Sequence, residues 1–185
     1  MLDKMLIRSY TPTNPILPLR DDTPETVPKN KWSPKAGNRD IPARDDNPRD
    51  GDGTFELVIK TYFPTDQQPG GAMTNLLDCM LIGESVEIRG PTGEIEYQGS
   101  GKFLIDGKQC TFRHVSLVLG GSGVTPGYAL MARVAVSGDQ SLDIQVVDAN
   151  SSEGDILLRS EMEELEDKSK GRIKITHVLS HPPES

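Results

Sequence analysis

The residues best suited to chemistry form a glycine-rich turn in the second half of the chain. The turn reads Gly120-Gly121-Ser122-Gly123-Val124-Thr125-Pro126 and lies between an apolar run and a helix-like segment. Glycines let the backbone approach a phosphate or a planar ring, and the helix that follows offers free N–H groups at its positive end. Glycines at such a turn can also serve packing alone, so the pattern by itself leaves ligand binding and packing equally open.

A second glycine turn, Gly70-Gly71-Ala72-Met73-Thr74, leads into a short helical segment at residues 75–81. Two such turns in one chain suggest one place for a diphosphate and another for a second nucleotide. The alternative is a purely structural glycine turn in which Thr74 is the N-cap of the helix.

The third candidate is the segment Arg8-Ser9-Tyr10-Thr11-Pro12. On an extended strand the side chains of Arg8 and Tyr10 point to one face and those of Ser9 and Thr11 to the other, because the side-chain period is two. A guanidinium can bind a diphosphate, and a neighbouring phenol can cover the face of a ring. An edge strand with polar surface residues would produce the same pattern.

The second half of the chain is expected to hold the first turn on a parallel sheet. Three apolar runs alternate with two helix-like segments, at residues 115–119, 124–136, 142–147, 156–167 and 172–179. This order predicts parallel strands joined by right-handed crossovers. Ser152 is followed three residues later by Asp155, which resembles a capping box for the second helix.

The first half of the chain has the pattern of a small antiparallel barrel. The run FELVIKTYF at residues 55–63 reads as a strand, and the shorter patterns SVEIRG, EIEYQG and KFLIDG are each closed by glycine or Gly-Pro. The preceding residues 13–53 contain seven of the fourteen prolines, mixed charges and almost no apolar periodicity, so they are predicted to be disordered. The predicted fold is a partial antiparallel β-barrel followed by a partial, Rossmann-like α/β domain.

The composition of the 185-residue chain limits its class of function. A net charge of −8 argues against sequence-independent binding of nucleic acid, because such binding requires a basic face. No apolar run is long enough to span a membrane and the first residues lack a secretory core, so we expect a cytoplasmic protein without a nucleic-acid or membrane partner. Cys79 and Cys110 have no CxxC pairing, and no metal ligands are assigned.

Together these motifs resemble the flavin and pyridine-nucleotide reductase module that cytochrome-b5 reductase and assimilatory nitrate reductase share within the ferredoxin-reductase-like superfamily. The matching pieces are RSYTP, LVIKTYF, PGGAMTNLLD, GESVEIRGPTGEIEYQGSGKF, LGGSGVTP and DANSSEGDILLRSEMEEL. They cover most of the sequence from Thr54 onward. The phrases GEIEYQGSGKFLIDGKQ and GGSGVTP are most similar to the nitrate reductase branch, and to its fungal members in particular.

The resemblance implies two cofactors, FAD and NADPH or NADH. It places Arg8 on the FAD diphosphate, Lys60 near the incoming nucleotide and Thr125 between flavin and nicotinamide. The backbone of Gly120 to Gly123 would form the floor of the nicotinamide site. Ala72 departs from the lysine that many relatives carry. The complete set of implied cofactor-binding residues is Arg8, Ser9, Tyr10, Thr11, Ile59, Lys60, Thr61, Tyr62, Ala72, Met73, Thr74, Gly120, Gly121, Ser122, Gly123, Thr125, Pro126 and Ser180.

The implied reaction is hydride transfer from nicotinamide C4 to flavin N5, followed by single-electron transfer to a cytochrome b5-type haem domain, with a molybdenum-cofactor domain elsewhere in the full enzyme. The cofactors supply this chemistry without a general base, so no catalytic residue is assigned, and His114, His177 and His181 are interpreted as structural or exposed. A cytochrome-b5 reductase-type enzyme remains an alternative. A non-catalytic remnant with at most weak nucleotide binding is an alternative of another class.

Ser180 and both chain ends depart from the family pattern. Relatives that prefer NADH tend to carry an aspartate at the place of Ser180, where it would repel a 2′-phosphate, so its loss favours NADPH. The family barrel has strands upstream of RSYTP, and its nucleotide domain continues to a Cys-Gly-Pro-Pro segment. We therefore expect two truncated domains, an FAD-binding barrel domain at residues 1–113 with the insertion at 13–53, and an NAD(P)-binding domain at residues 114–185.

Overall fold

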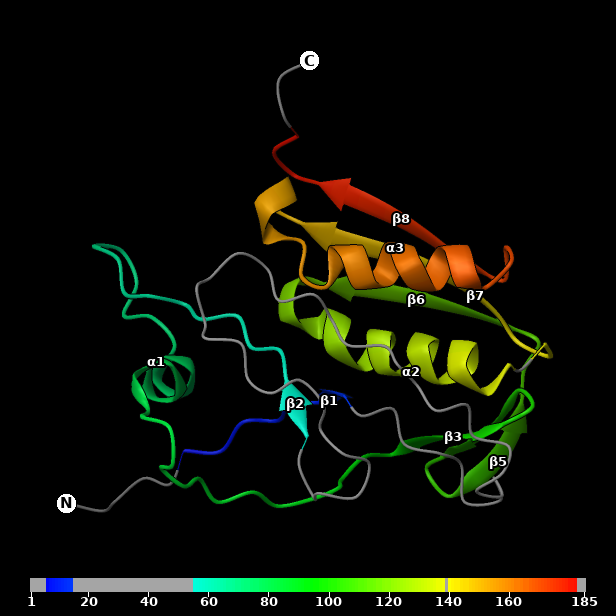
Figure 1. The fold of residues 1–185 in the computed structure, drawn as a ribbon, viewed down its shortest axis with the longest axis horizontal. Coiled ribbons are helices and arrows are strands. Elements are labelled where there is room, and N and C mark those ends of the chain that lie inside the picture. The colour runs from blue at the N-terminus through cyan, green and yellow to red at the C-terminus, as the bar shows by residue number, and fades with distance from the viewer. Residues whose placement is uncertain (1–5, 15–54, 139, 183–185) are drawn as a thin grey trace.

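The computed structural model describes residues 6–14, 55–138 and 140–182. They form an antiparallel part, residues 6–14 and 55–113, and a parallel part, residues 114–138 and 140–182. Figure 1 shows the two parts side by side, with helix α2 (Val124–Ser137) between them.

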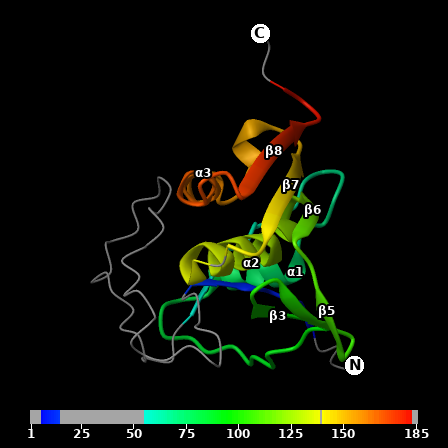
Figure 2. The same cartoon turned by 90° about the vertical axis from the view of Figure 1, so that its right-hand side faces the viewer.

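The parallel part is a three-stranded sheet with two helices on one face. Its elements in chain order are β6 (His114–Gly120), the 3-10 helix η1 (Gly121–Gly123), α2, β7 (Asp143–Asn150), the 3-10 helix η2 (Glu153–Asp155), α3 (Arg159–Lys168) and β8 (Ile173–Leu179). The strands run parallel in the order β6-β7-β8, and α2 and α3 lie on the same side of them (Figure 2). The predicted alternation of strand and helix is confirmed.

Helix α3 begins later than the pattern from Ile156 predicts. Its first residue is Arg159, because Leu158 has a left-handed backbone with φ of 57° that interrupts the helical path. The Asp155 Oδ2 atom accepts hydrogen bonds from the Ser152 amide at 3.1 Å and from its hydroxyl at 2.7 Å. The predicted capping box is therefore present, but it caps the N-terminus of η2 and not that of α3.

The sheet has one covered and one open face. Along β7 the side chains of Ile144 and Val146 are buried against the helices, whereas Val147, the next residue after Val146, points to the other face and is exposed. Val118 on β6 lies opposite Val147 and is 82% exposed. Because strand side chains alternate between faces, this pattern assigns the helix-covered face to the core.

Helix α2 is buried on two sides. Tyr128 and Met131 are completely buried, and the helix contacts both β6 and α3 of the parallel part and β1 and β3 of the antiparallel part. Burial raises the pKa of the Tyr128 hydroxyl above its usual value, so the side chain stays neutral. Since α2 packs on both parts, it fixes the position of the glycine turn at its N-terminus relative to the antiparallel part.

The antiparallel part contains two separate sheets. Its elements are β1 (Pro12–Asn14), β2 (Glu56–Leu57), α1 (Ala72–Cys79), β3 (Ile95–Gly99), β4 (Lys102–Ile105) and β5 (Lys108–Thr111). Strands β1 and β2 pair with each other, and β3, β4 and β5 form a meander. Antiparallel strands followed by a parallel sheet confirm the predicted fold class, although the strands of the described residues do not close into one barrel.

Several predicted strands of the antiparallel part are shorter or absent. Of residues 55–63 only Glu56–Leu57 pair as a strand, residues 85–90 form none, and the RSYTP segment is paired only from Pro12. Apolar and β-branched composition shows that a segment suits a sheet, but a strand also requires a neighbour for its backbone hydrogen bonds. Strand β5 was missed, although Asp106-Gly107 before it is typical of a hairpin turn.

The prediction that residues 13–53 are disordered is wrong for the first two of them. Thr13 and Asn14 belong to β1 and are buried. The Thr13 hydroxyl donates to the Glu56 carbonyl oxygen at 3.4 Å, and the Asn14 amide donates to the Glu56 carboxylate at 3.3 Å. These hydrogen bonds hold Thr13 and Asn14 in the strand, although no apolar pattern in the sequence predicts a strand there. The rest of the segment predicted to be disordered lies outside the described residues.

Within the described ranges, none of the helices combines the length and the apolar character needed to cross a lipid bilayer.

Candidate functional site

The carboxyl ends of the three parallel strands meet at one edge of the sheet. The glycine turn follows β6, η2 follows β7, and Ser180 follows β8. The amide of Ser180 donates to the Asn150 carbonyl oxygen at 3.1 Å, which joins the ends of β7 and β8. In open α/β sheets, ligands bind outside the carboxyl ends of the strands, so this edge is the candidate site.

The first glycine turn presents open backbone at this edge. A Cβ atom added to Gly123 would meet no atom within 4 Å, and one added to Gly121 would first meet the Tyr62 hydroxyl at 4.0 Å. Thr125 is buried, and its hydroxyl donates to the Ser122 carbonyl oxygen at 3.3 Å, which stiffens the turn. The exposed side chains of Ser122 and Pro126 flank it. The turn therefore leaves room for a flat group above the backbone.

The extended segment of residues 58–63 brings a cation and an aromatic ring to the turn. Ile59, Lys60 and Thr61 are partly buried, whereas Tyr62 is 48% exposed. The Lys60 ammonium lies 5.9 Å from the centre of the Tyr62 ring, close enough for a cation–π contact. The predicted residues Lys60 and Tyr62 and the predicted Gly120–Gly123 turn are thus neighbours in space.

The second glycine turn is fastened to the backbone of Tyr62. The amide of Gly71 and the side-chain amide of Asn75 both donate to the Tyr62 carbonyl oxygen at 2.8 Å. The N-cap of α1 is Gly71, so the predicted N-cap Thr74 lies inside the helix, where its hydroxyl donates to the Gly71 carbonyl oxygen at 3.1 Å. Asn75 was missed by sequence reasoning, because its partner lies thirteen residues away across a turn.

The N-terminus of α1 retains donors for a ligand. The first intrahelical bond runs from the Asn75 amide to the Gly71 carbonyl oxygen at 2.9 Å. The amides of Ala72, Met73 and Thr74 precede it and have no partner within the helix. These are the donors that a diphosphate would use, whereas the Thr74 hydroxyl already bonds within the turn.

The predicted residues near the N-terminus lie outside this cluster of contacts. Arg8 and Ser9 are exposed, and Tyr10 and Thr11 are partly buried. The Arg8 guanidinium donates to the carbonyl oxygen of Ile7 at 2.7 Å. That bond occupies one of its five donors, so the role of Arg8 with a diphosphate stays a prediction.

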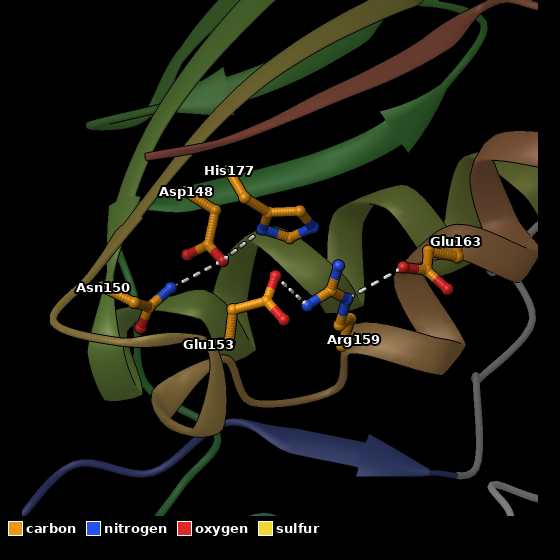
Figure 3. Close-up of polar contacts among 6 residues, drawn as sticks. All are labelled: Asp148, Asn150, Glu153, Arg159, Glu163 and His177. Carbon is orange, nitrogen blue, oxygen red and sulfur yellow. Dashed lines mark hydrogen bonds and ion pairs between the residues drawn. The ribbon is translucent and has the colours of Figure 1, made fainter. Parts of the chain in front are cut away.

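A salt bridge joins the two parts of the chain at the candidate site. The Lys60 ammonium lies 2.6 Å from Asp155 Oδ1, and the two side chains are 26% and 32% exposed. The η2 helix that carries Asp155 is tied to α3, because Arg159 binds Glu153 at 2.8 Å and Glu163 at 3.0 Å (Figure 3). These carboxylates, Glu153 foremost, raise the pKa of Arg159 above its usual value.

A buried polar group supports the ends of β7 and β8 (Figure 3). Asp148 Oδ2 accepts a hydrogen bond from the Asn150 amide at 2.8 Å and lies 3.1 Å from His177 Nδ1. Asp148 is 1% exposed and stands directly opposite His177 in the strand register. Sequence reasoning could not pair residues 29 positions apart, and the contact gives His177 a structural role.

The Lys60–Asp155 pair makes stability depend on pH. Hydrogen bonds from Lys60 first and Ser152 second hold the pKa of Asp155 below its usual value. A carboxyl with a lowered folded pKa stabilises the fold above its unfolded pKa of about 4, and this contribution is lost as the pH falls through the folded pKa. We expect Lys60→Met to lower the midpoint of urea unfolding at about pH 7 but not at about pH 2, and only slightly, because the pair is partly exposed.

The control for this experiment is Lys168→Met, which removes the same charge from an exposed pair with Glu164 within α3. Subtracting its effect at each pH corrects for the change in net charge. An equal loss of stability from Lys60→Met at both pH values would contradict the prediction.

Two family models match the chain in sequence. The oxidoreductase FAD-binding domain matches residues 43–97, and the oxidoreductase NAD-binding domain matches residues 117–185. The glycine turns fall in separate matches, the second turn in the FAD-binding and the first in the NAD-binding one. This agrees with the predicted classes of cofactor, a flavin and a nicotinamide dinucleotide.

Nitrate reductases are among the curated relatives of this chain. The NADPH enzyme of Neurospora crassa is 40% identical over 134 residues, which is 70% of this chain and 14% of that protein. The NADH enzyme 2 of Nicotiana tabacum is 33% identical over 180 residues, which is 96% of this chain and 16% of that protein. This chain thus spans about one seventh of the length of these relatives. Fungal and plant relatives both match, so the predicted fungal affinity is left open.

Solved structures agree with the sequence relatives. The cytochrome b5 reductase domain of Ulva prolifera nitrate reductase superposes with a TM-score of 0.67 at 30% identity, covering 70% of this chain and 50% of that one. The CS-b5R domains of human Ncb5or have a TM-score of 0.61 at 22% identity, covering 100% of this chain and 41% of that one, which supports the fold alone.

The fold, the two family matches and the strand-edge site define an FAD- and NAD-binding oxidoreductase of the ferredoxin-reductase-like class. Within this class, the chain is similar in sequence to nitrate reductases and similar in structure to the cytochrome b5 reductase domain of one of them. The comparisons lend no support to the alternative of a non-catalytic remnant.

Proposed function

We propose that this chain binds FAD and NADPH and passes reducing equivalents from the nucleotide to the flavin, as one module of a larger cytoplasmic nitrate reductase. In that enzyme a cytochrome b5-type haem domain receives the electrons, and a molybdenum-cofactor domain lies elsewhere. The observation that carries the proposal is the meeting of Lys60, Tyr62 and both glycine turns at the carboxyl edge of the parallel sheet. We assign the flavin to residues 1–113 and the nucleotide to residues 114–185.

The residues present fit the two cofactors. Open backbone at Gly121 and Gly123 fits a planar nicotinamide, and the α1 amides of Ala72, Met73 and Thr74 fit an anionic diphosphate. The exposed Arg8 guanidinium supplies further donors for that diphosphate. When bound, FAD supplies the ability to accept a hydride and release single electrons.

The protein's own contribution is to orient the two cofactors and to shield their reacting rings from water. The Tyr62 hydroxyl lies 4.0 Å from the position of a Cβ added to Gly121, so this side chain borders the space above the turn and would help to exclude water from it once both cofactors are bound. The hydrogen bond from Thr125 to Ser122 holds the turn and thereby fixes the position of the backbone on which the nicotinamide would lie. No side chain is required to move a proton during hydride transfer.

The direct test uses the purified full chain with added FAD. We expect visible flavin absorbance to remain with the protein after desalting, and NADPH-dependent reduction of ferricyanide to appear only in the flavin-loaded sample. A chain that retains no flavin and shows no ferricyanide reduction would exclude the proposed function.

Ser180 is proposed to favour NADPH over NADH. The residue is exposed directly after β8, where its amide bonds to Asn150 at the site edge. A carboxylate introduced there would accept a ribose 2′-hydroxyl but repel a 2′-phosphate. We expect Ser180→Asp to lower the ratio of kcat/KM for NADPH to that for NADH by about 10- to 100-fold.

The matched control is Ser180→Asn, which adds the same bulk without the charge and should leave the ratio within about threefold of wild type. A wild-type chain that turns over NADH at least as well as NADPH would remove this prediction.

A further inference from the structure

The contact between Lys60 and Asp155 crosses the site and is made by residues 95 positions apart. Its oxygen-to-nitrogen distance of 2.6 Å is that of a short, charge-assisted hydrogen bond. The two side chains come from different parts of the chain, the extended segment before α1 and the η2 helix after β7. The contact is therefore a link between the flavin side and the nucleotide side of the proposed site.

The two partners differ in how firmly they are held. Asp155 uses its second oxygen, Oδ2, to accept two hydrogen bonds from Ser152, and Arg159 ties the same short helix to α3 through Glu153. Lys60 belongs to a segment without strand pairing and carries its charge on a long, flexible stem. If one partner moves, it is the ammonium of Lys60 that can swing away while the carboxylate stays in place.

The ammonium is held at the place where anionic groups would enter. It lies beside the Tyr62 ring, whose hydroxyl approaches Gly121 of the open turn. A dinucleotide bound at this edge carries a diphosphate, and a phosphate and a carboxylate compete for the same ammonium donors.

We propose that Asp155 limits the affinity of the site for a dinucleotide by occupying Lys60 in the ligand-free chain, so that a ligand diphosphate must displace the carboxylate. Asp155 is thus a specificity-determining residue that acts through Lys60, and it favours ligands with enough negative charge to compete. The inference rests on the proposed function, because it requires the dinucleotide to bind at this edge.

The test measures the Kd of NADP⁺ by titration calorimetry on the full chain loaded with FAD. Asp155→Asn keeps the size of the side chain and leaves Lys60 unpaired, so we expect NADP⁺ to bind about two- to tenfold more tightly. The gain should shrink when the NaCl concentration rises from about 0.05 M to about 0.5 M, because salt screens partly exposed charges. An unchanged or larger Kd in Asp155→Asn would overturn the inference.

Three further variants separate this role from a structural one. Asp155→Glu restores a carboxylate and should return the Kd towards wild type. Ser152→Ala removes a hydrogen bond to Asp155 without touching the Lys60 contact, and Glu164→Gln removes a carboxylate from α3, so neither should tighten binding. Tightening of similar size in either control would show that loop mobility or net charge is the cause, and would overturn the inference.

A double substitution shows whether Asp155 acts through Lys60. In a Lys60→Met background, the gain from Asp155→Asn should largely disappear, because the ammonium it would release is absent. An equal gain in both backgrounds would mean simple charge repulsion and overturn the inference. Wild-type chain that does not bind NADP⁺ would reject the proposed function and this inference together, whereas binding that Asp155→Asn leaves unchanged would reject the inference alone.

Discussion

Replacement of Gly70 by alanine is expected to weaken FAD binding about 10- to 100-fold and to lower the free energy of unfolding by about 3 kcal/mol. Gly70 has a φ of +76°, and an added Cβ would lie 2.7 Å from the Pro64 nitrogen and 2.8 Å from the Tyr62 carbonyl oxygen. Both atoms are backbone and cannot turn aside as a side chain could. The turn must therefore open, which displaces the α1 amides proposed to bind the diphosphate.

The matched control for Gly70 is Gly107, which lies in the turn between β4 and β5. Its φ is +74°, almost the same, but an added Cβ would meet no atom within 4 Å. Gly107→Ala should therefore cost only the left-handed strain of about 1 kcal/mol and leave flavin binding unchanged. Urea unfolding and FAD titration of both variants measure the two effects. If Gly70→Ala changed stability and FAD affinity no more than Gly107→Ala, the turn at Gly70 would have no special part in flavin binding.

Replacement of Gly123 by valine is expected to reduce kcat/KM for NADPH about 100-fold without loss of FAD or of stability. Gly123 has ordinary helical angles, φ of −68° and ψ of −5°, and nothing lies within 4 Å of an added Cβ. The protein itself therefore tolerates a side chain here. A nicotinamide ring on the floor of the turn would collide with it, because the open space is the space that the ring would use.

Gly93→Val is the control for Gly123→Val, since Gly93 also has open space around an added Cβ but lies in the segment before β3. Ferricyanide reduction should keep its wild-type kcat/KM in this variant. Full NADPH-dependent activity in Gly123→Val would show that the glycine turn is not the nicotinamide floor. Loss of flavin absorbance in Gly123→Val would show instead that this substitution damages the fold.

The parallel part could be predicted almost completely from the sequence. Apolar runs of strand length and a helix-like segment ending before Gly138 determine β6, α2 and β7, because these patterns depend on neighbours within a few residues. The glycine turn was found for the same reason. The start of α3 was missed, since the left-handed backbone of Leu158 has no signal in residue type.

The antiparallel part was predicted less well, because its strands depend on partners distant in the chain. Residues 85–90 have suitable side chains and form no strand, whereas Thr13 and Asn14 lack an apolar pattern and are buried beneath the shared helix α2. Burial of such polar residues follows from their hydrogen bonds to Glu56, and these require the chain to return after more than forty residues.

The chemistry of the site divides along the same line. Residue types alone identified the two glycine turns, because a glycine turn before a helix is a local pattern. Lys60 and Tyr62 were implied only by the resemblance to a known reductase family. Residue types could not pair Lys60 with Asp155 or Asp148 with His177. Those contacts depend on strand register and on the packing of one part of the chain against the other, which bring charges 95 and 29 residues apart within hydrogen-bonding distance.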